Sequence, residues 1–211
     1  MAKGANDLIL RDRLQFDIDA SGDTALVYGR IDLSDYVSIP EAKGLAIKEI
    51  RFQLRTRVTG DAGVWPNYMG PTDPSTFAAT AAFRPQVKLF ATTTAYENVV
   101  DVGIGSPNVL CVFDKQNTLL VGGAAPGAAT SMVLDSYEHM HGTPDLHPEG
   151  YDVVTDLLIG ISVENCTHPS LVSSTAEIDV MIIAEKKKIT SKDLTQMLSQ
   201  AQDRDWETSD G

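Results

Sequence analysis

Three of the chain's four histidines lie within the short segment between Glu138 and Glu149, and no other segment comes as close to a site for chemistry. His139 and His141 are two residues apart, so on a strand both side chains would project to the same side. Two imidazoles held in this way are suited to binding a transition metal. His147 follows in the same segment and is the third candidate ligand.

This His-x-His pair followed by a carboxylate is similar to the first motif of the cupin family, whose fold is a β-barrel of the jelly-roll type. The resemblance implies a metal-dependent enzyme that binds its ion through His139 and His141. The chain departs from the family pattern, because Asp145 stands where the family has a glutamate and no later motif supplies another histidine. We therefore expect no catalytic residue, no bound metal and no cofactor, and we keep a cupin-like enzyme as an alternative function.

A row of arginines lies on the clearest strand pattern of the chain. Every second side chain from Ile50 to Val58 is apolar or threonine, and Arg51, Arg55 and Arg57 alternate with them. Because strand side chains point alternately to opposite faces, this pattern predicts a half-buried strand with a basic outer face. The formal net charge of the chain is -12, which argues against nucleic acid as a tightly bound partner. We expect the arginines to pair with acidic residues of a neighbouring strand or a neighbouring subunit.

The same strand begins upstream with the opposite parity. Leu45 and Ile47 are apolar at odd positions, and the pattern changes at Glu49 and Ile50. A slip of one residue within a strand is what a β-bulge produces. The sequence therefore predicts one long, bent strand that covers a core.

Length and composition limit the remaining possibilities. The 211 residues are 43% hydrophobic, which is enough for one large domain. No nucleotide-binding glycine motif, no GxSxG and no CxxC occurs, and Cys111 and Cys166 lie in apolar strand patterns where a free thiol is expected. No apolar run has the length of a signal peptide or a membrane span, so we expect neither.

Nine or ten segments carry strand patterns with turn signals between them, the spacing typical of a sandwich or barrel. Residues 109–113 and 118–121 are predicted to form a hairpin around the polar turn 114–117. Gly29 is predicted to mark a kink or a close backbone contact. These features predict an all-β fold, a jelly-roll-like antiparallel β-sandwich. The expected strands are 8–18, 25–31, 45–58, 86–93, 98–102, 109–113, 118–121, 131–138, 151–163 and 178–184.

Three segments have apolar content that the sandwich does not need, and we expect each to contact neighbouring subunits: the N-terminal arm (residues 1–6), a long loop and a terminal helix. Residues 59–85 are predicted to form a long loop, and its aromatic side chains favour a loop that is buried against something. Residues 191–202 have apolar side chains at helical spacing after a capping-box-like start at Thr190 and Asp193, so we expect a short amphipathic helix there. The chain then divides into a sandwich domain, 1–189, and a terminal helix with an acidic tail, 190–211. The predicted interface residues are Trp65, Tyr68, Phe77, Leu194, Met197 and Leu198.

In strand number, loop lengths and terminal extensions, the chain resembles viral single jelly-roll capsid proteins. The resemblance implies a self-assembling coat subunit of a virion, assembled in the host cytoplasm, whose partners are copies of itself and other virion proteins. Many such proteins have a basic N-terminal arm, whereas this chain has only Lys3 before Arg11, which implies a shell that does not hold nucleic acid tightly. A carbohydrate- or ligand-binding β-sandwich that uses Trp65 and Tyr68 is the second alternative.

Overall fold

The computed structural model describes residues 7–58, 62–73, 80–125, 128–142 and 149–195. Nearly all of the regular structure in these residues is β-strand, because the sequence alternates between apolar and polar side chains over most of its length. The elements, in chain order, are β1 (Asp7–Ile18), β2 (Thr24–Ile31), β3 (Lys43–Thr56), β4 (Thr80–Phe83), β5 (Gln86–Thr92), the 3-10 helix η2 (Val99–Asp101), β6 (Val109–Ala125), β7 (Ala128–His141), β8 (Tyr151–Val153), β9 (Leu157–Glu164) and β10 (Ser174–Lys188).

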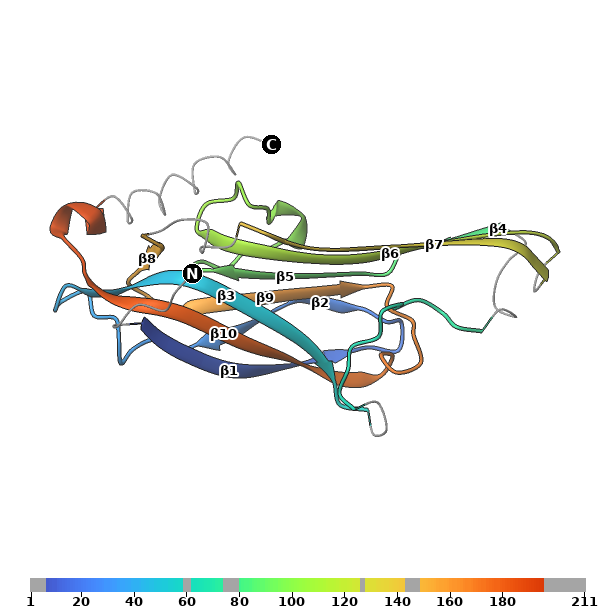
Figure 1. The fold of residues 1–211 in the computed structure, drawn as a ribbon, viewed down its shortest axis with the longest axis horizontal. Coiled ribbons are helices and arrows are strands. Elements are labelled where there is room, and N and C mark those ends of the chain that lie inside the picture. The colour runs from blue at the N-terminus through green and yellow to red at the C-terminus, as the bar shows by residue number, and fades with distance from the viewer. Residues whose placement is uncertain (1–6, 59–61, 74–79, 126–127, 143–148, 196–211) are drawn as a thin grey trace.

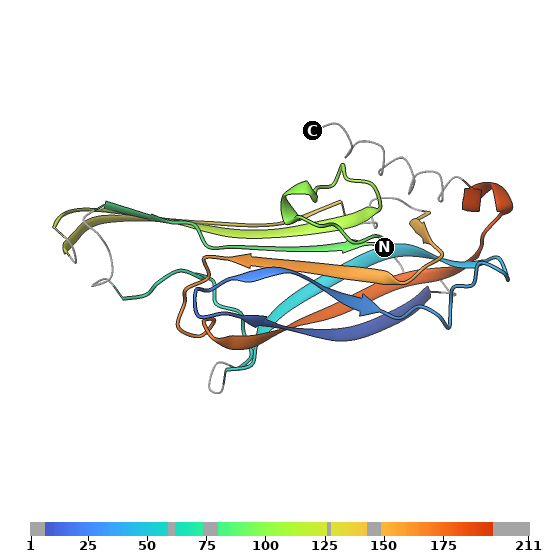
Figure 2. The same cartoon turned by 180° about the vertical axis from the view of Figure 1, so that it is seen from behind.

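The strands form two antiparallel sheets that pack face to face (Figures 1 and 2). Sheet A has the order β1-β10-β3-β8, and sheet B has the order β2-β9-β5-β6-β4, with β7 paired to β6. If β4 and β7 are set aside, the pairs are nested: β5 with β6, β3 with β8, β2 with β9 and β1 with β10. Eight strands paired in this way form a jelly roll, which confirms the predicted fold class.

The main core lies between the two sheets. Alternate residues of each strand point into it, as the period-two pattern predicts, while Phe52 and Leu54 pack half-buried at its margin. A second, smaller cluster lies on the outer face of sheet B, where residues 93–108 cover Phe90 and Val112. The most deeply buried side chains of the main core include Leu45, Ile47, Ile50, Leu89, Leu157, Ile159 and Ile178.

The predicted change of parity in β3 is a β-bulge. Ile183 of β10 pairs with Glu49, and the next residue, Ala184, pairs with Ile47, so Lys48 is the extra residue. The Lys48 ammonium lies 2.9 Å from Oδ1 of Asp7 and 2.6 Å from Oε2 of Glu185. The bulge therefore redirects a lysine toward two carboxylates of neighbouring strands, and their hydrogen bonds raise the pKa of Lys48.

The prediction for Gly29 is also confirmed. A Cβ on this residue of β2 would overlap the side chain of Leu14 in β1, so the two sheets approach closely at this point. The glycine lets one edge of the sandwich close.

Four predicted elements are wrong. The predicted strand 151–163 is two strands, β8 in sheet A and β9 in sheet B. Residues 98–102 contain η2 instead of a strand, and the last part of the predicted 59–85 loop is the strand β4, which pairs with β6. Residues 109–113 and 118–121 belong to one strand, β6, because the residues expected to turn between them have partners on either side. Lys115 is buried 2.8 Å from Glu138 of β7, and Asn117 accepts a hydrogen bond from Met69 N and donates one to the Ser136 hydroxyl.

The chain reverses instead between β6 and β7, and this longer hairpin extends beyond the sandwich. Figure 1 shows β4 and the far halves of β6 and β7 running past the ends of β5 and β9 as a narrow ribbon. We call this part the ribbon: β4, residues 118–125 and residues 128–135.

The start of the predicted terminal helix is confirmed over residues 191–195. Asp193 N is 3.2 Å from the Thr190 hydroxyl, and the same hydroxyl donates to the Asp193 carboxylate at 2.6 Å. The Asp193 carboxylate accepts hydrogen bonds from the Thr190 hydroxyl and from the Thr190 backbone N–H, and both lower the pKa of Asp193. The remainder of the predicted helix and tail lies outside the described residues. Within the described part of the chain, no helix is long and apolar enough to cross a membrane.

Candidate functional site

The ribbon has apolar side chains that the rest of the chain leaves in solvent. Leu120 in β6 is 45% exposed, and Val133 and Leu134 in β7 are 59% and 55% exposed. Leu120 pairs directly with Val133, and Leu119 pairs with Leu134, so exposed apolar groups occur on both faces of the hairpin. Exposed apolar side chains that gather on one element, as here, suit contact with another protein surface.

A small cluster fixes the base of the ribbon to the sandwich. Leu119 and Val121 are buried, and the partly buried side chains of Tyr68 and Phe83 pack against them. The Tyr68 hydroxyl donates a hydrogen bond to the carbonyl oxygen of Pro71 at 3.2 Å. This bond stabilises the conformation of the loop segment that carries Tyr68. One side of β6 is therefore covered, whereas Leu134, the cross-strand partner of Leu119, is not.

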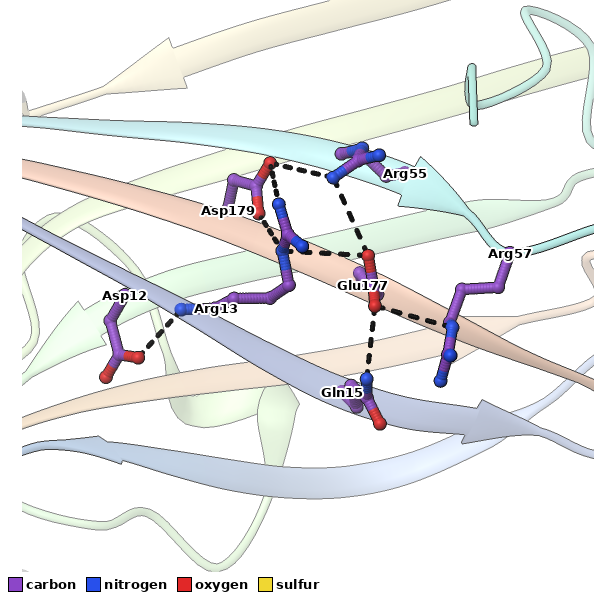
Figure 3. A network of polar contacts seen from close by, with 7 residues as sticks. All are labelled: Asp12, Arg13, Gln15, Arg55, Arg57, Glu177 and Asp179. Atoms are coloured by element: carbon purple, nitrogen blue, oxygen red, sulfur yellow. Dashed lines mark hydrogen bonds and ion pairs between the residues drawn. The ribbon is translucent and has the colours of Figure 1, made fainter. Parts of the chain in front are cut away.

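The outer face of sheet A, unlike the apolar ribbon, carries a network of ion pairs (Figure 3). Glu177 of β10 is buried and lies 3.7 Å from Arg13 Nε, 3.7 Å from Arg55 Nη1 and 3.4 Å from Arg57 Nε. Gln15 donates to the same carboxylate at 3.1 Å. Side chains from the two flanking strands, β1 and β3, and from the residue after β3 thus surround one carboxylate. They satisfy a charge that would be costly to bury alone.

Asp179 extends this network along β10. Its carboxylate accepts a hydrogen bond from Arg13 Nε at 2.6 Å and another from Arg55 Nη1 at 3.3 Å. The hydrogen bond from Arg13 is the main cause that holds the pKa of Asp179 below its ordinary value. Arg51 pairs with Glu49 on its own strand. The three predicted arginines therefore pair with acidic residues within the chain.

The predicted histidine pair lies on a strand, at the end of β7. His139 is the cross-strand partner of Asp114, and His141 is the partner of Val112, so both rings lie on the outer face of sheet B. Their ring centroids are 4.3 Å apart, and His141 Nε2 is 3.5 Å from Asp114 Oδ2. The Tyr137 hydroxyl lies 3.2 Å from the same nitrogen, which makes a polar cluster on an exposed strand.

This cluster differs from the metal site that the cupin resemblance implies. Within the described ranges, no group of three or more histidine, cysteine or carboxylate side chains is arranged to hold a metal ion. His147, the third candidate ligand, lies outside these ranges. The expected absence of a metal or catalytic residue stays a prediction.

The predicted interface residues fall in different surroundings. Trp65 is 8% exposed and its ring lies 6.4 Å from that of Phe16, so most of the indole contacts the chain's own core. Tyr68 is half-buried at the base of the ribbon, and Leu194 is half-buried in the terminal helical turn. Their role at an interface stays a prediction. Phe77, Met197, Leu198 and the N-terminal arm lie outside the residues that the structure describes.

Sequence reasoning did not identify the exposed residues Leu120, Val133 and Leu134. In a sequence, an apolar residue on a strand looks the same whether it faces a core or solvent. The available signal was the glycine- and alanine-rich sequence of residues 122–129, where β6 ends at Ala125 and β7 begins at Ala128.

Comparison with known protein families finds none that matches this chain, and comparison with curated proteins finds no match either.

Proposed function

We propose that this protein is a structural subunit that assembles with copies of itself into a closed shell, as viral single jelly-roll capsid proteins do. The observation that carries the proposal is the ribbon, which leaves Leu120, Val133 and Leu134 exposed beyond a complete jelly-roll sandwich. A sandwich that is already closed around its core gains no stability from such an extension. The extension becomes favourable when a neighbouring subunit covers its apolar side chains.

The charges of the sandwich support the same proposal. On the outer face of sheet A, Arg51, Arg55 and Arg57 are each neutralised by a carboxylate of the same chain. Arginines engaged in this way have less capacity to neutralise phosphates, and the net charge of -12 repels a polyanion. The proposed shell is therefore one whose subunits associate through protein contacts and do not hold nucleic acid tightly. Its location would be the virion, where other virion proteins would be its partners.

The experiment is light scattering after size-exclusion chromatography, followed by electron microscopy of the eluted material. The proposal predicts particles of uniform size that contain many copies of the chain. A protein that stays monomeric at every concentration and salt condition tested would contradict it. Metal analysis and a glycan-binding screen on the same sample test the cupin-like and carbohydrate-binding alternatives.

A pair of matched variants tests the role of the ribbon. Leu134→Lys places a charge on the ribbon, where the native side chain is 55% exposed, and we expect a folded monomer. Ile39→Lys changes a side chain that is 45% exposed in the β2–β3 loop, at the end of the sandwich opposite the ribbon (Figure 1). This control is expected to assemble. Equal loss of assembly in both variants would show that the ribbon has no special role.

A further inference from the structure

β7 is a long strand with one free edge. Its ladder with β6 runs without a register shift from Ser131 to His141, and among the described residues no second strand pairs with it. Every second residue of β7 therefore points its backbone N–H and C=O away from β6. A row of such groups is a template for pairing with a further strand.

The other sheet edges of this molecule have features that discourage such pairing. β1 carries five charged residues among its twelve, β8 and β4 have three and four residues, and β2 has a register shift between Thr24 and Val27. The part of β3 that β8 does not cover carries Arg51 and Arg55. β7 contains no lysine, arginine or proline, and only two of its fourteen residues, Asp135 and Glu138, are carboxylates. Val133, Leu134 and Tyr137 of β7 are exposed as well. Of the edges described, β7 is therefore the one built to accept a strand.

We infer that β7 pairs with the same strand of a second copy, antiparallel, across a two-fold axis at Tyr137. The two six-stranded sheets would then join edge to edge. This inference rests on the proposed function, because it names the contact through which two subunits first associate.

The sequence of β7 selects this register. In a symmetric antiparallel pair centred on Tyr137, a residue a given number of positions before the centre faces the partner's residue the same number after it. Asp135 then faces the partner's His139, and Ser136 faces the partner's Glu138. Leu134 faces the partner's Met140. Both acidic residues thus meet a group that can donate a hydrogen bond, and an apolar residue meets an apolar one.

Neighbouring registers lose this complementarity. A pair centred on Asp135 or on Glu138 places two carboxylates directly opposite each other, which is destabilising. A pair centred on Ser136 places Leu134 against the partner's Glu138, and a pair centred on Leu134 places Asp135 against the partner's Val133. Glu138 already pairs with Lys115 of its own chain, so a carboxylate or a leucine placed opposite it would disturb an existing ion pair.

Cysteine cross-linking reads the register directly. Single substitutions to cysteine are made at each position from 133 to 139, and each chain is oxidised mildly in its assembled state. A residue can form a disulfide with its own symmetry mate only where the two Cα atoms come within about 4.4–6.8 Å, which in this pairing occurs at the centre. We expect Tyr137→Cys to give about tenfold more covalent dimer than Asp135→Cys. The native thiols do not compete, because burial raises the pKa of both Cys111 and Cys166 to about 12.

A second cross-linking experiment leaves Tyr137 unchanged. Chains carrying Ser136→Cys and chains carrying Glu138→Cys are mixed, and the inferred register predicts a disulfide between the two kinds of chain but little within either kind. Large particles that form with no cross-link at 137 and none in the mixture would overturn the inference and leave the shell function standing. A cross-linked dimer that never grows larger would instead support the inference and contradict the shell function.

Discussion

The outer face of sheet A and the ribbon are both exposed, yet they differ in whether the same chain supplies partners for their side chains. On sheet A, Glu177 and Asp179 are surrounded by arginines of the same molecule, so the surface is complete in a single chain. On the ribbon, Val133 and Leu134 have no comparable cover. Solvation explains the difference, since charges can be satisfied locally whereas apolar groups are stabilised only when water is removed from them.

This contrast separates a surface that stabilises the monomer from a surface that serves association. Substitutions on sheet A should change the free energy of unfolding of one chain. Substitutions at the exposed apolar residues of the ribbon should leave that free energy nearly unchanged and alter the association of chains.

The largest expected effect is a difference in unfolding free energy between substitutions at the two residues of one cross-strand pair, Leu119 and Leu134. Leu119→Ala removes a buried side chain from the base of the ribbon and should cost about 2–5 kcal/mol of unfolding free energy. Leu134→Ala changes the exposed partner and should stay within about 0.5 kcal/mol. Urea unfolding at a concentration where the chain is monomeric measures both. Equal losses would mean that Leu134 is covered within its own chain.

A smaller effect is expected on sheet A. Glu177→Gln keeps a hydrogen-bonding group but removes the charge that faces three arginines, and we expect a loss of about 1–3 kcal/mol. Glu41→Gln is the control, because Glu41 pairs with Lys43 and its side chain is 60% exposed. An ion pair this exposed contributes little to the free energy of unfolding, so the control should change it less than Glu177→Gln does. If the two substitutions cost the same, the network around Glu177 adds nothing to an ordinary surface pair.

The smallest effect is a change in pH dependence. The folded pKa of Asp179 lies below its ordinary value of 3.8, first because of the hydrogen bond from Arg13. A carboxyl with a lowered folded pKa stabilises the fold above its unfolded pKa, and this stabilisation is lost as the pH falls through the folded value. Urea midpoints should therefore fall below about pH 4, and Asp179→Asn should fall less steeply. Parallel curves for the two proteins would mean that Asp179 does not contribute to the pH dependence of stability.

The sequence predicted the sandwich well because local patterns determine most of it. The parity change at Glu49 located the bulge at Lys48, and Thr190 with Asp193 located the start of the helix. Residues 114–117 were misread as a turn, because partners distant in the sequence, such as Met69 and Glu138, determine whether polar side chains can lie within a strand.

The ribbon could not be predicted for the same physical reason. Whether an apolar strand residue is buried depends on what covers it, and the cover of β6 comes from Tyr68 and Phe83, which lie far from it in the sequence. The arginine pairs were predictable as a class, since a basic strand face next to acidic strands leaves few other arrangements. Their carboxylate partners, Glu177 and Asp179, became identifiable only once β10 was placed beside β3.

Hydrogen–deuterium exchange of the chain, measured while monomeric and again while assembled, tests the central claim most directly. The account predicts that backbone amides of residues 131–141 in β7 exchange about tenfold more slowly, or slower still, after assembly. Amides in the middle of β10, which β1 and β3 already hold on both sides, should change little. Assembly that leaves the exchange of β7 unchanged would contradict the account, because the ribbon would then still lack a partner.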